Sequence, residues 1–132
     1  MNVQDSPVIY IVEDDPSVRN GLIRLMRSAD LTARGYADAE SFLEDIDAGA
    51  QGCVLLDIAL PRASGLDTKA LLNARFIDIP VIIISAHDEE ETQARAMELG
   101  ARLFMRKPVD DVALLDAITQ TLSDESAKRA GQ

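Results

Sequence analysis

Polar side chains that can bind or transfer charged groups stand directly after four short apolar runs of the sequence. Three acids follow the first run, and later runs lead to one carboxylate, one hydroxyl and one ammonium group. Carboxylates that lie close together repel one another, and a hard divalent cation held by oxygen ligands offsets that cost. If the fold gathers these residues, they form a metal site with a nucleophile beside it. They are Glu13, Asp14, Asp15, Asp57, Ser85 and Lys107.

A site of this composition supports phosphoryl transfer. Mg²⁺ is usually held by one or two carboxylates together with waters and a phosphate oxygen. A neighbouring carboxylate can accept a phosphoryl group as an acyl phosphate, while an ammonium group balances the added charge. Each residue alone has a plainer role, because acids before a helix often cap it and a single lysine is usually solvated. It is the combination that favours a site.

The apolar runs predict the sheet that would gather these residues. Five short apolar segments alternate strictly with five amphipathic ones, and continuous β-branched runs are typical of strands buried on both faces. This alternation predicts an α/β fold, a single doubly wound five-stranded parallel sheet with helices on both faces. Ligands bind such sheets outside the carboxyl ends of the strands. The expected strands are 8–12, 32–36, 53–57, 81–84 and 101–105, and the expected helices begin at residues 15–16, 38, about 66, about 88 and about 110.

The first expected helix has an apolar stripe and a polar face. Asp15 is a suitable N-cap, and Pro16 suits the first helical position. Ile23 stands at the border of the stripe. The stripe comprises Val18, Leu22, Leu25, Met26 and Ala29, and the polar face, which we expect to be solvated, carries Arg19, Asn20, Arg24 and Arg27.

Composition restricts the class of protein. The chain has 132 residues, enough for one domain, and 47% of them are hydrophobic. A net charge of −10 argues against binding to nucleic acid or to an anionic membrane surface. Cys53 is the single cysteine, so no intrachain disulfide can form, and no apolar run reaches the length of a membrane span. No basic segment followed by an apolar stretch opens the chain, so we expect a cytoplasmic protein without a signal peptide.

Domain boundaries follow from the same pattern. We expect one domain over residues 1–123 and a polar, frayed tail over residues 124–132. Nothing after Ser123 has the apolar pattern of a second domain.

At this point the chain resembles the receiver domains of two-component response regulators, over about Val8 to Leu122. The resemblance rests on the acids at 13–15, on Asp57-Ile58-Ala59-Leu60-Pro61 with Gly65 following, on Ser85-Ala86, and on Phe104 three residues before Lys107-Pro108. The run from 94 to 115 is similar to receivers of the nitrogen-fixation regulator type. The departures are small: Leu60 replaces a common Met, and Ser85 replaces the commoner Thr. The resemblance implies a flavodoxin-like receiver fold with strand order 2-1-3-4-5.

The resemblance also implies roles for individual residues. Asp57 would be the phosphoacceptor, and Lys107 would bind the phosphoryl group, with a Lys107–Pro108 bond that is often cis. Ser85 would supply the switch hydroxyl. The implied ligands of Mg²⁺ are Asp14, Asp15, the Asp57 carboxylate and the backbone carbonyl of Ala59, with Glu13 as a weaker further candidate.

Two further expectations concern switching and the lifetime of the phosphoryl group. Phe104 is a candidate rotamer switch that would fill the space vacated when Ser85 moves toward a phosphoryl group, although aromatic residues mostly serve burial. His87, the only histidine, stands two residues after Ser85, as Ala59 stands two after Asp57. We hypothesise that Ala59 and His87 set how readily water reaches the acyl phosphate.

The implied partners are a sensor histidine kinase or a histidine phosphotransfer protein, docking on the polar face of the first helix with Ile23 as an apolar contact. A homodimer could form through the fourth helix, fifth strand and fifth helix. The implied domain modifies itself with Mg²⁺ and is not a turnover enzyme. It is either a stand-alone regulator or the receiver of a transcription factor, whose DNA binding would belong to another part.

Three other classes fit the sequence less well. A phosphatase of the haloacid dehalogenase type needs an Asp two residues after its nucleophile, where this chain has Ala59. A flavodoxin-like cofactor carrier needs a phosphate loop rich in Ser, Thr and Gly after the first strand, where this chain has three acids. A receiver-like domain that only binds partners usually lacks one of the site residues, and none is missing here.

Overall fold

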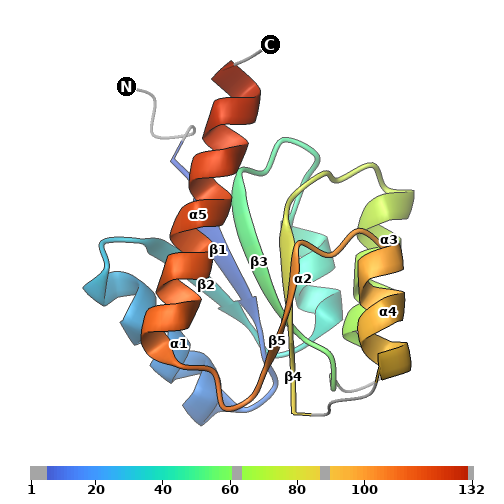
Figure 1. The fold of residues 1–132 in the computed structure, drawn as a ribbon, viewed down its shortest axis with the longest axis horizontal. Helices are drawn as coiled ribbons and strands as arrows, with labels where there is room; N and C mark the ends of the chain where they lie inside the picture. Colours follow the sequence, from blue (N-terminus) through green and yellow to red (C-terminus); the bar gives the residue numbers. More distant parts are fainter. Residues whose placement is uncertain (1–5, 61–63, 87–89, 131–132) are drawn as a thin grey trace.

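The computed structural model describes residues 6–60, 64–86 and 90–130 and has five parallel strands alternating with five helices (Figure 1). The strands are hydrogen-bonded in the order β2-β1-β3-β4-β5. This confirms the expected doubly wound sheet and its strand order. The elements are β1 (Val8–Val12), α1 (Pro16–Ser28), β2 (Thr32–Tyr36), α2 (Ala39–Asp45), β3 (Gly52–Asp57), α3 (Gly65–Ala74), β4 (Val81–Ser85), α4 (Glu90–Glu98), β5 (Leu103–Arg106) and α5 (Asp111–Ala130).

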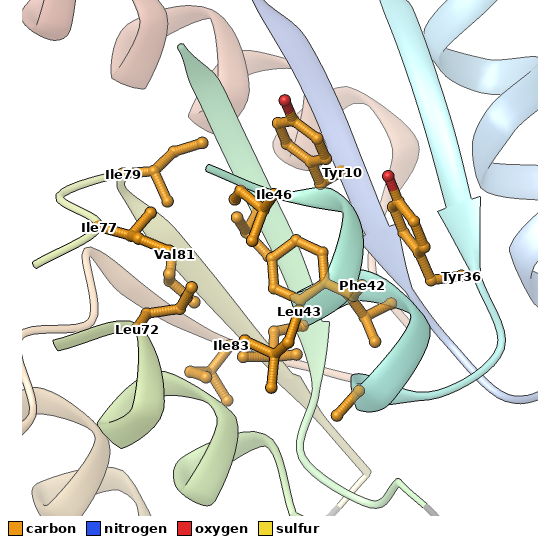
Figure 2. Packing of buried hydrophobic residues seen from close by; sticks show 14 of the residues in the cluster. Tyr10, Tyr36, Phe42, Leu43, Ile46, Leu72, Ile77, Ile79, Val81 and Ile83 are labelled. Carbon is orange, nitrogen blue, oxygen red and sulfur yellow. The ribbon is translucent and has the colours of Figure 1, made fainter. Parts of the chain in front are cut away.

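Alternate residues of the central strands point to opposite faces of the sheet and build two separate cores. The first core lies under α2, α3 and α4 and contains the aromatic side chains of Tyr10, Tyr36 and Phe42, which pack edge to face or stacked (Figure 2). The second core lies under α1 and α5 and includes Met26 and Ile118. Both faces of β1, β3 and β4 are therefore covered, as their uninterrupted apolar sequences require.

The structure differs from the sequence-based expectation mainly at the C-terminus. Residues 124–132 were expected to form a frayed tail, but α5 continues to Ala130, and residues 131–132 lie outside the described part of the chain. No glycine or proline interrupts this stretch, and Asp124 forms an ion pair with Arg102, just before β5, and accepts a hydrogen bond from Gln120. The ion pair holds α5 to the segment before β5 at a point beyond the last buried residue of the helix, Thr121. The strand expected over 101–105 begins two residues later, at Leu103.

The two ends of α3 are built differently. Ser64 and Asp67 form a reciprocal capping box at its start. At its end Phe76 adopts a positive φ of 58°, and its N–H donates to the carbonyl of Asn73. This is the left-handed conformation that glycine usually provides at a helix C-terminus.

Among the residues that the structure describes, no helix combines the length and the apolarity that crossing a bilayer requires.

Candidate functional site

Parallel pairing aligns the carboxyl ends of β1, β3, β4 and β5 at one edge of the sheet. Glu13 follows β1 directly, and its N–H donates to the carbonyl of Tyr36 at the end of β2. Asp57 is the last residue of β3, and it pairs with Ile84 of β4. The N–H of Lys107 donates to the carbonyl of Ser85 at 2.8 Å, which carries the lysine past the end of β5 to the same edge.

A single ammonium group joins two buried carboxylates at this edge. Lys107 Nζ lies 2.9 Å from Glu13 Oε1 and 3.1 Å from Asp57 Oδ2. The Glu13 and Asp57 side chains are 4% and 7% exposed, against 29% for Lys107, so both acids lose most of their hydration. The second oxygens are also held, because Asp57 Oδ1 accepts the N–H of Ala59 and Glu13 Oε2 accepts that of Asp15. Both carboxylates are thereby fixed in orientation.

The pKa values reflect this arrangement. Burial raises the pKa of Glu13 above its usual value, the hydrogen bonds from Lys107 and Asp15 oppose that rise, and the charge of Asp57 adds to it. Burial alone would lower the pKa of Lys107, but its hydrogen bonds to Glu13 and Asp57 and their negative charges raise it overall. The lysine therefore remains an ammonium group at neutral pH.

Three acids can present oxygen atoms to one cation. One carboxylate oxygen from each of Glu13, Asp14 and Asp57 lies within 4.8 Å of the other two. Asp14 is exposed, whereas the other two are buried. An oxygen-only donor set that is open on one side suits Mg²⁺, which retains several waters. The residues present therefore fit the metal that the sequence implies.

Asp15, expected among the metal ligands, lies outside this cluster. Its Oδ1 accepts the N–H groups of Ser17 and Val18 and so caps α1 at its N-terminus. Successive residues at a strand end point in different directions, and the helix requires a cap at this position. The structure thus places Glu13, the weakest candidate by sequence, in the cluster where Asp15 was expected.

The remaining expected residues lie as follows. Ser85 is fully buried at the end of β4, and Phe104 is half-buried against the core under α2, α3 and α4. Ala59 is exposed beside Asp57, and a metal contact through its carbonyl stays a prediction. The Lys107–Pro108 bond is cis, as expected. His87 lies outside the described residues.

A pocket of about 510 Å³ opens at the Asp57 carboxylate. Its polar end is formed by Glu13, Asp57 and Lys107. Its walls are aliphatic and come from α1, the central strands and the segment after β5, including Val18, Leu22, Leu55, Ile84 and Val109. A group delivered to Asp57 would therefore enter beside the N-terminal half of α1.

Arg19 lies closer to the site than its place on the polar face of α1 predicted. It was expected on a solvated face, but it is half-buried, and its Nη1 donates to the carbonyl of Glu13 at 2.8 Å and contacts that of Asp14 at 3.5 Å. A signal was present in the sequence, because Gly35 interrupts a short strand, and a glycine inside a strand often marks a close approach by another group.

The chain is similar to known proteins over most of its length. The family model of the response regulator receiver domain matches residues 9–119. The response regulator protein TmoT of Ectopseudomonas mendocina is 40% identical over 92% of this chain and 55% of its own length. The transcriptional regulatory protein FixJ of Azorhizobium caulinodans is 34% identical over 97% of this chain and 60% of its own length.

A solved structure of the response regulator StyR has a TM-score of 0.88 and 38% identity, over 96% of this chain and 64% of that one. The chain spans little more than half the length of the curated relatives described above.

Proposed function

The chain belongs to the response regulator receiver family, and from that premise we propose that Asp57 takes a phosphoryl group from a phosphohistidine in a two-component system. The donor is a sensor histidine kinase or a histidine phosphotransfer protein. The domain then changes its signalling surface and slowly returns to the unmodified state. It promotes its own modification and does not turn over a free metabolite.

The proposed transfer exchanges one phosphorus bond for another. A carboxylate oxygen of Asp57 attacks phosphorus, the phosphorus–nitrogen bond of the donor breaks, and its electron pair remains on the imidazole ring, which is restored to neutral histidine by taking up a proton. The product is an acyl phosphate on Asp57. Water later attacks this group and releases inorganic phosphate and the free carboxylate.

The chain's own residues position the reacting groups. Lys107 holds Asp57 before transfer and can follow the developing negative charge onto the phosphoryl oxygens, because its ammonium group is hydrogen-bonded to that carboxylate. The N–H of Ala59 fixes the other Asp57 oxygen. Glu13, Asp14 and Asp57 would hold Mg²⁺, which supplies further neutralisation of charge on the phosphoryl group.

The observation that carries this proposal is the bridge of Lys107 between Glu13 and Asp57. A structural ion pair would need one carboxylate, whereas here two buried carboxylates share one ammonium group. A third carboxylate, that of Asp14, has an oxygen within 4.8 Å of an oxygen of each of the two. The excess negative charge is suited to a divalent ion and a phosphoryl group.

The test is incubation with acetyl phosphate, with and without Mg²⁺, followed by intact mass measurement of the wild type, Asp57→Asn and the matched control Asp116→Asn on α5. We expect the wild type and the control to gain one phosphoryl group only with Mg²⁺, and Asp57→Asn to gain none. A folded wild type that binds Mg²⁺ yet gains nothing from acetyl phosphate or from a phosphorylated donor protein would overturn the proposal in favour of a domain that only binds partners.

The proposed output surface consists of α4, β5 and α5. Ser85 would move toward the phosphoryl group, and Phe104 would take up the space it leaves. Exposed Met97, Leu103 and Val112 give this surface apolar character that suits a homodimer. Sedimentation of the protein before and after phosphorylation tests this, and a monomer in both states argues against it.

The proposed lifetime of the phosphoryl group depends on Ala59 and His87. Ala59 is exposed directly beside Asp57, so a larger side chain there would obstruct water. We expect Ala59→Tyr to lengthen the half-life of the acyl phosphate, and an unchanged half-life for variants at both positions contradicts this role.

The output of the whole protein follows from its relatives only as a proposal. FixJ is described as a transcriptional regulatory protein, and this chain covers 60% of its length. We propose that this receiver acts in the cytoplasm and that any DNA binding belongs to a part other than this acidic domain.

A further inference from the structure

The loop that carries the metal-binding acids is tied down by a side chain from α1. Arg19 lies one turn into this helix, and its Nη1 donates to the carbonyl of Glu13 at 2.8 Å and lies 3.5 Å from the carbonyl of Asp14. Both carbonyls belong to residues whose carboxylates reach toward Asp57. The guanidinium group therefore contacts the backbone of two acids and leaves their side chains available.

A glycine in β2 makes room for this contact. A Cβ atom at Gly35 would lie 3.1 Å from both Cγ and Cδ of Arg19 and 2.8 Å from Cδ1 of Ile23. The aliphatic part of the arginine thus lies flat against the strand, where another residue would push it away. Glycine weakens a strand interior, so a packing requirement accounts for its presence here. The guanidinium group of Arg19 is therefore held by the loop after β1, and its aliphatic part is held by Gly35 of β2.

We propose that Arg19 is a positioning residue, which fixes the backbone of Glu13 and Asp14 so that their carboxylates converge with that of Asp57 on one cation. This inference rests on the proposed function and extends it. Arg19 acts on the cation only through the two acids.

Charge and geometry predict opposite effects on Mg²⁺ affinity, which makes the proposal testable. A guanidinium group near the site repels a cation, so loss of its charge alone would tighten Mg²⁺ binding. Loss of positioning would weaken it. Loss of an outer contact that orients metal ligands typically costs tenfold or more in affinity.

The experiment measures Mg²⁺ dissociation constants by calorimetric titration for Arg19→Met, Arg19→Lys, Gly35→Ala and the control Arg24→Met. Arg24 is exposed on the same helix, so its variant removes the same charge. We expect Arg19→Met, which keeps an apolar stem over Gly35, to weaken Mg²⁺ binding on the order of tenfold. Arg19→Lys and Gly35→Ala should weaken Mg²⁺ binding less, and Arg24→Met should leave Mg²⁺ binding equal or slightly tighter.

The rate of mass gain from acetyl phosphate is a second measurement. For the Arg19 variants this rate should return to within about twofold of the wild-type rate at saturating Mg²⁺, because Asp57 and Lys107 are intact.

Unchanged or tighter Mg²⁺ binding by Arg19→Met overturns the proposal and leaves only the effect of charge. If Arg19→Met does not fold, as judged by circular dichroism, Arg19→Lys and Gly35→Ala decide the question, since both retain a cation. A wild type that binds Mg²⁺ but accepts no phosphoryl group would contradict the proposed function and leave the role of Arg19 intact. A wild type that binds no Mg²⁺ would overturn both.

Discussion

Two lysines lose hydration in different parts of the protein, one at the carboxyl edge of the sheet and one on α3, and their charges are compensated in different ways. Lys107 lies between the carboxylates of Glu13 and Asp57. Lys69, on α3, is 7% exposed, and its Nζ donates to Asn73 Oδ1 at 2.6 Å. Asn73 in turn donates to the carbonyl of Leu99 at 2.9 Å, next to the end of α4. One ammonium group therefore faces negative charges, whereas the other faces a neutral amide.

The pKa shifts have opposite signs for this reason. Hydrogen bonds and charges from two acids outweigh burial at Lys107 and raise its pKa. Burial dominates at Lys69 and lowers its pKa, with only the charge of Asp78 opposing it. Lys107 belongs to a group of charges that would be unbalanced without it, whereas Lys69 mainly ties two helices together. Lys107 thus balances two buried carboxylates at the proposed site, whereas Lys69 contributes a contact between helices.

The largest expected effect on stability comes from removing the charge of Lys107, and the same change at Lys69 is the comparison. Lys107→Met leaves two buried carboxylates with no cation, and we expect the free energy of unfolding to fall by about 1–3 kcal/mol. Lys69→Met removes a desolvated charge and fills similar space, so we expect a change within about 1 kcal/mol. Urea denaturation of both variants measures this difference. Equal losses would show that the two lysines serve the same purpose.

The sequence predicted the location of Lys107 at the edge of the sheet but not the contacts of Lys69. Lys107 follows a short apolar strand, and parallel topology alone brings it to the edge where Asp57 ends β3. Lys69 stands in an amphipathic helix, and its contact with the end of α4 depends on how α3 is rotated against its neighbour. No periodic pattern encodes that rotation.

The strand bounds were predictable to within one residue for β1 to β4, because continuous apolar runs allow no other register.

The next effect concerns the amide that joins α3 to α4. Asn73→Ala leaves Lys69 Nζ without its acceptor and the Leu99 carbonyl without this donor. We expect a loss of about 1–2 kcal/mol in the free energy of unfolding. The double variant Lys69→Met/Asn73→Ala should lose less than the sum of the two single changes, because the pair acts as one unit. Strict additivity in denaturation experiments would argue that Asn73 holds α4 independently of the lysine.

A smaller effect on the free energy of unfolding is expected at the C-terminal end of α3. Phe76 is 87% exposed and has a φ of 58°, so its ring contributes little burial to offset an unfavourable backbone conformation. Phe76→Gly should raise the free energy of unfolding by about 0.5–1 kcal/mol. Asp30, with a φ of 60° after α1, is the matched control, because aspartate tolerates this conformation better. A gain at Asp30→Gly as large as that at Phe76→Gly would contradict this explanation.

The sequence left open which of the three adjacent acids Glu13, Asp14 and Asp15 would lie near Asp57. Asp15 was predicted both as the N-cap of α1 and as a metal ligand, and the structure confirms the cap. The cap falls to Asp15 because it immediately precedes Pro16, the first residue of α1. Arg19 was misplaced because helical periodicity describes the faces of a helix but not the length of an arginine, which can return to a loop one turn earlier.

The smallest expected effect is the pH dependence of Lys69, and its sign follows from the lowered pKa. Below that lowered pKa the lysine is charged in both states, and its burial destabilises the folded protein in full. As the pH rises toward the usual value of 10.5, the unfolded chain binds more protons than the folded one, so stability increases through this window.

Other groups titrate in the same range, and the quantity to measure is therefore the difference in unfolding free energy between wild type and Lys69→Met. We expect the wild type to gain on the variant by less than about 1 kcal/mol between pH 7 and pH 10.5. Lys69→Arg, which keeps its charge throughout, should show no such gain over the same variant. A difference that stays constant or falls with pH would mean that Asp78 and the end of α4 stabilise the ammonium form at least as much as burial destabilises it.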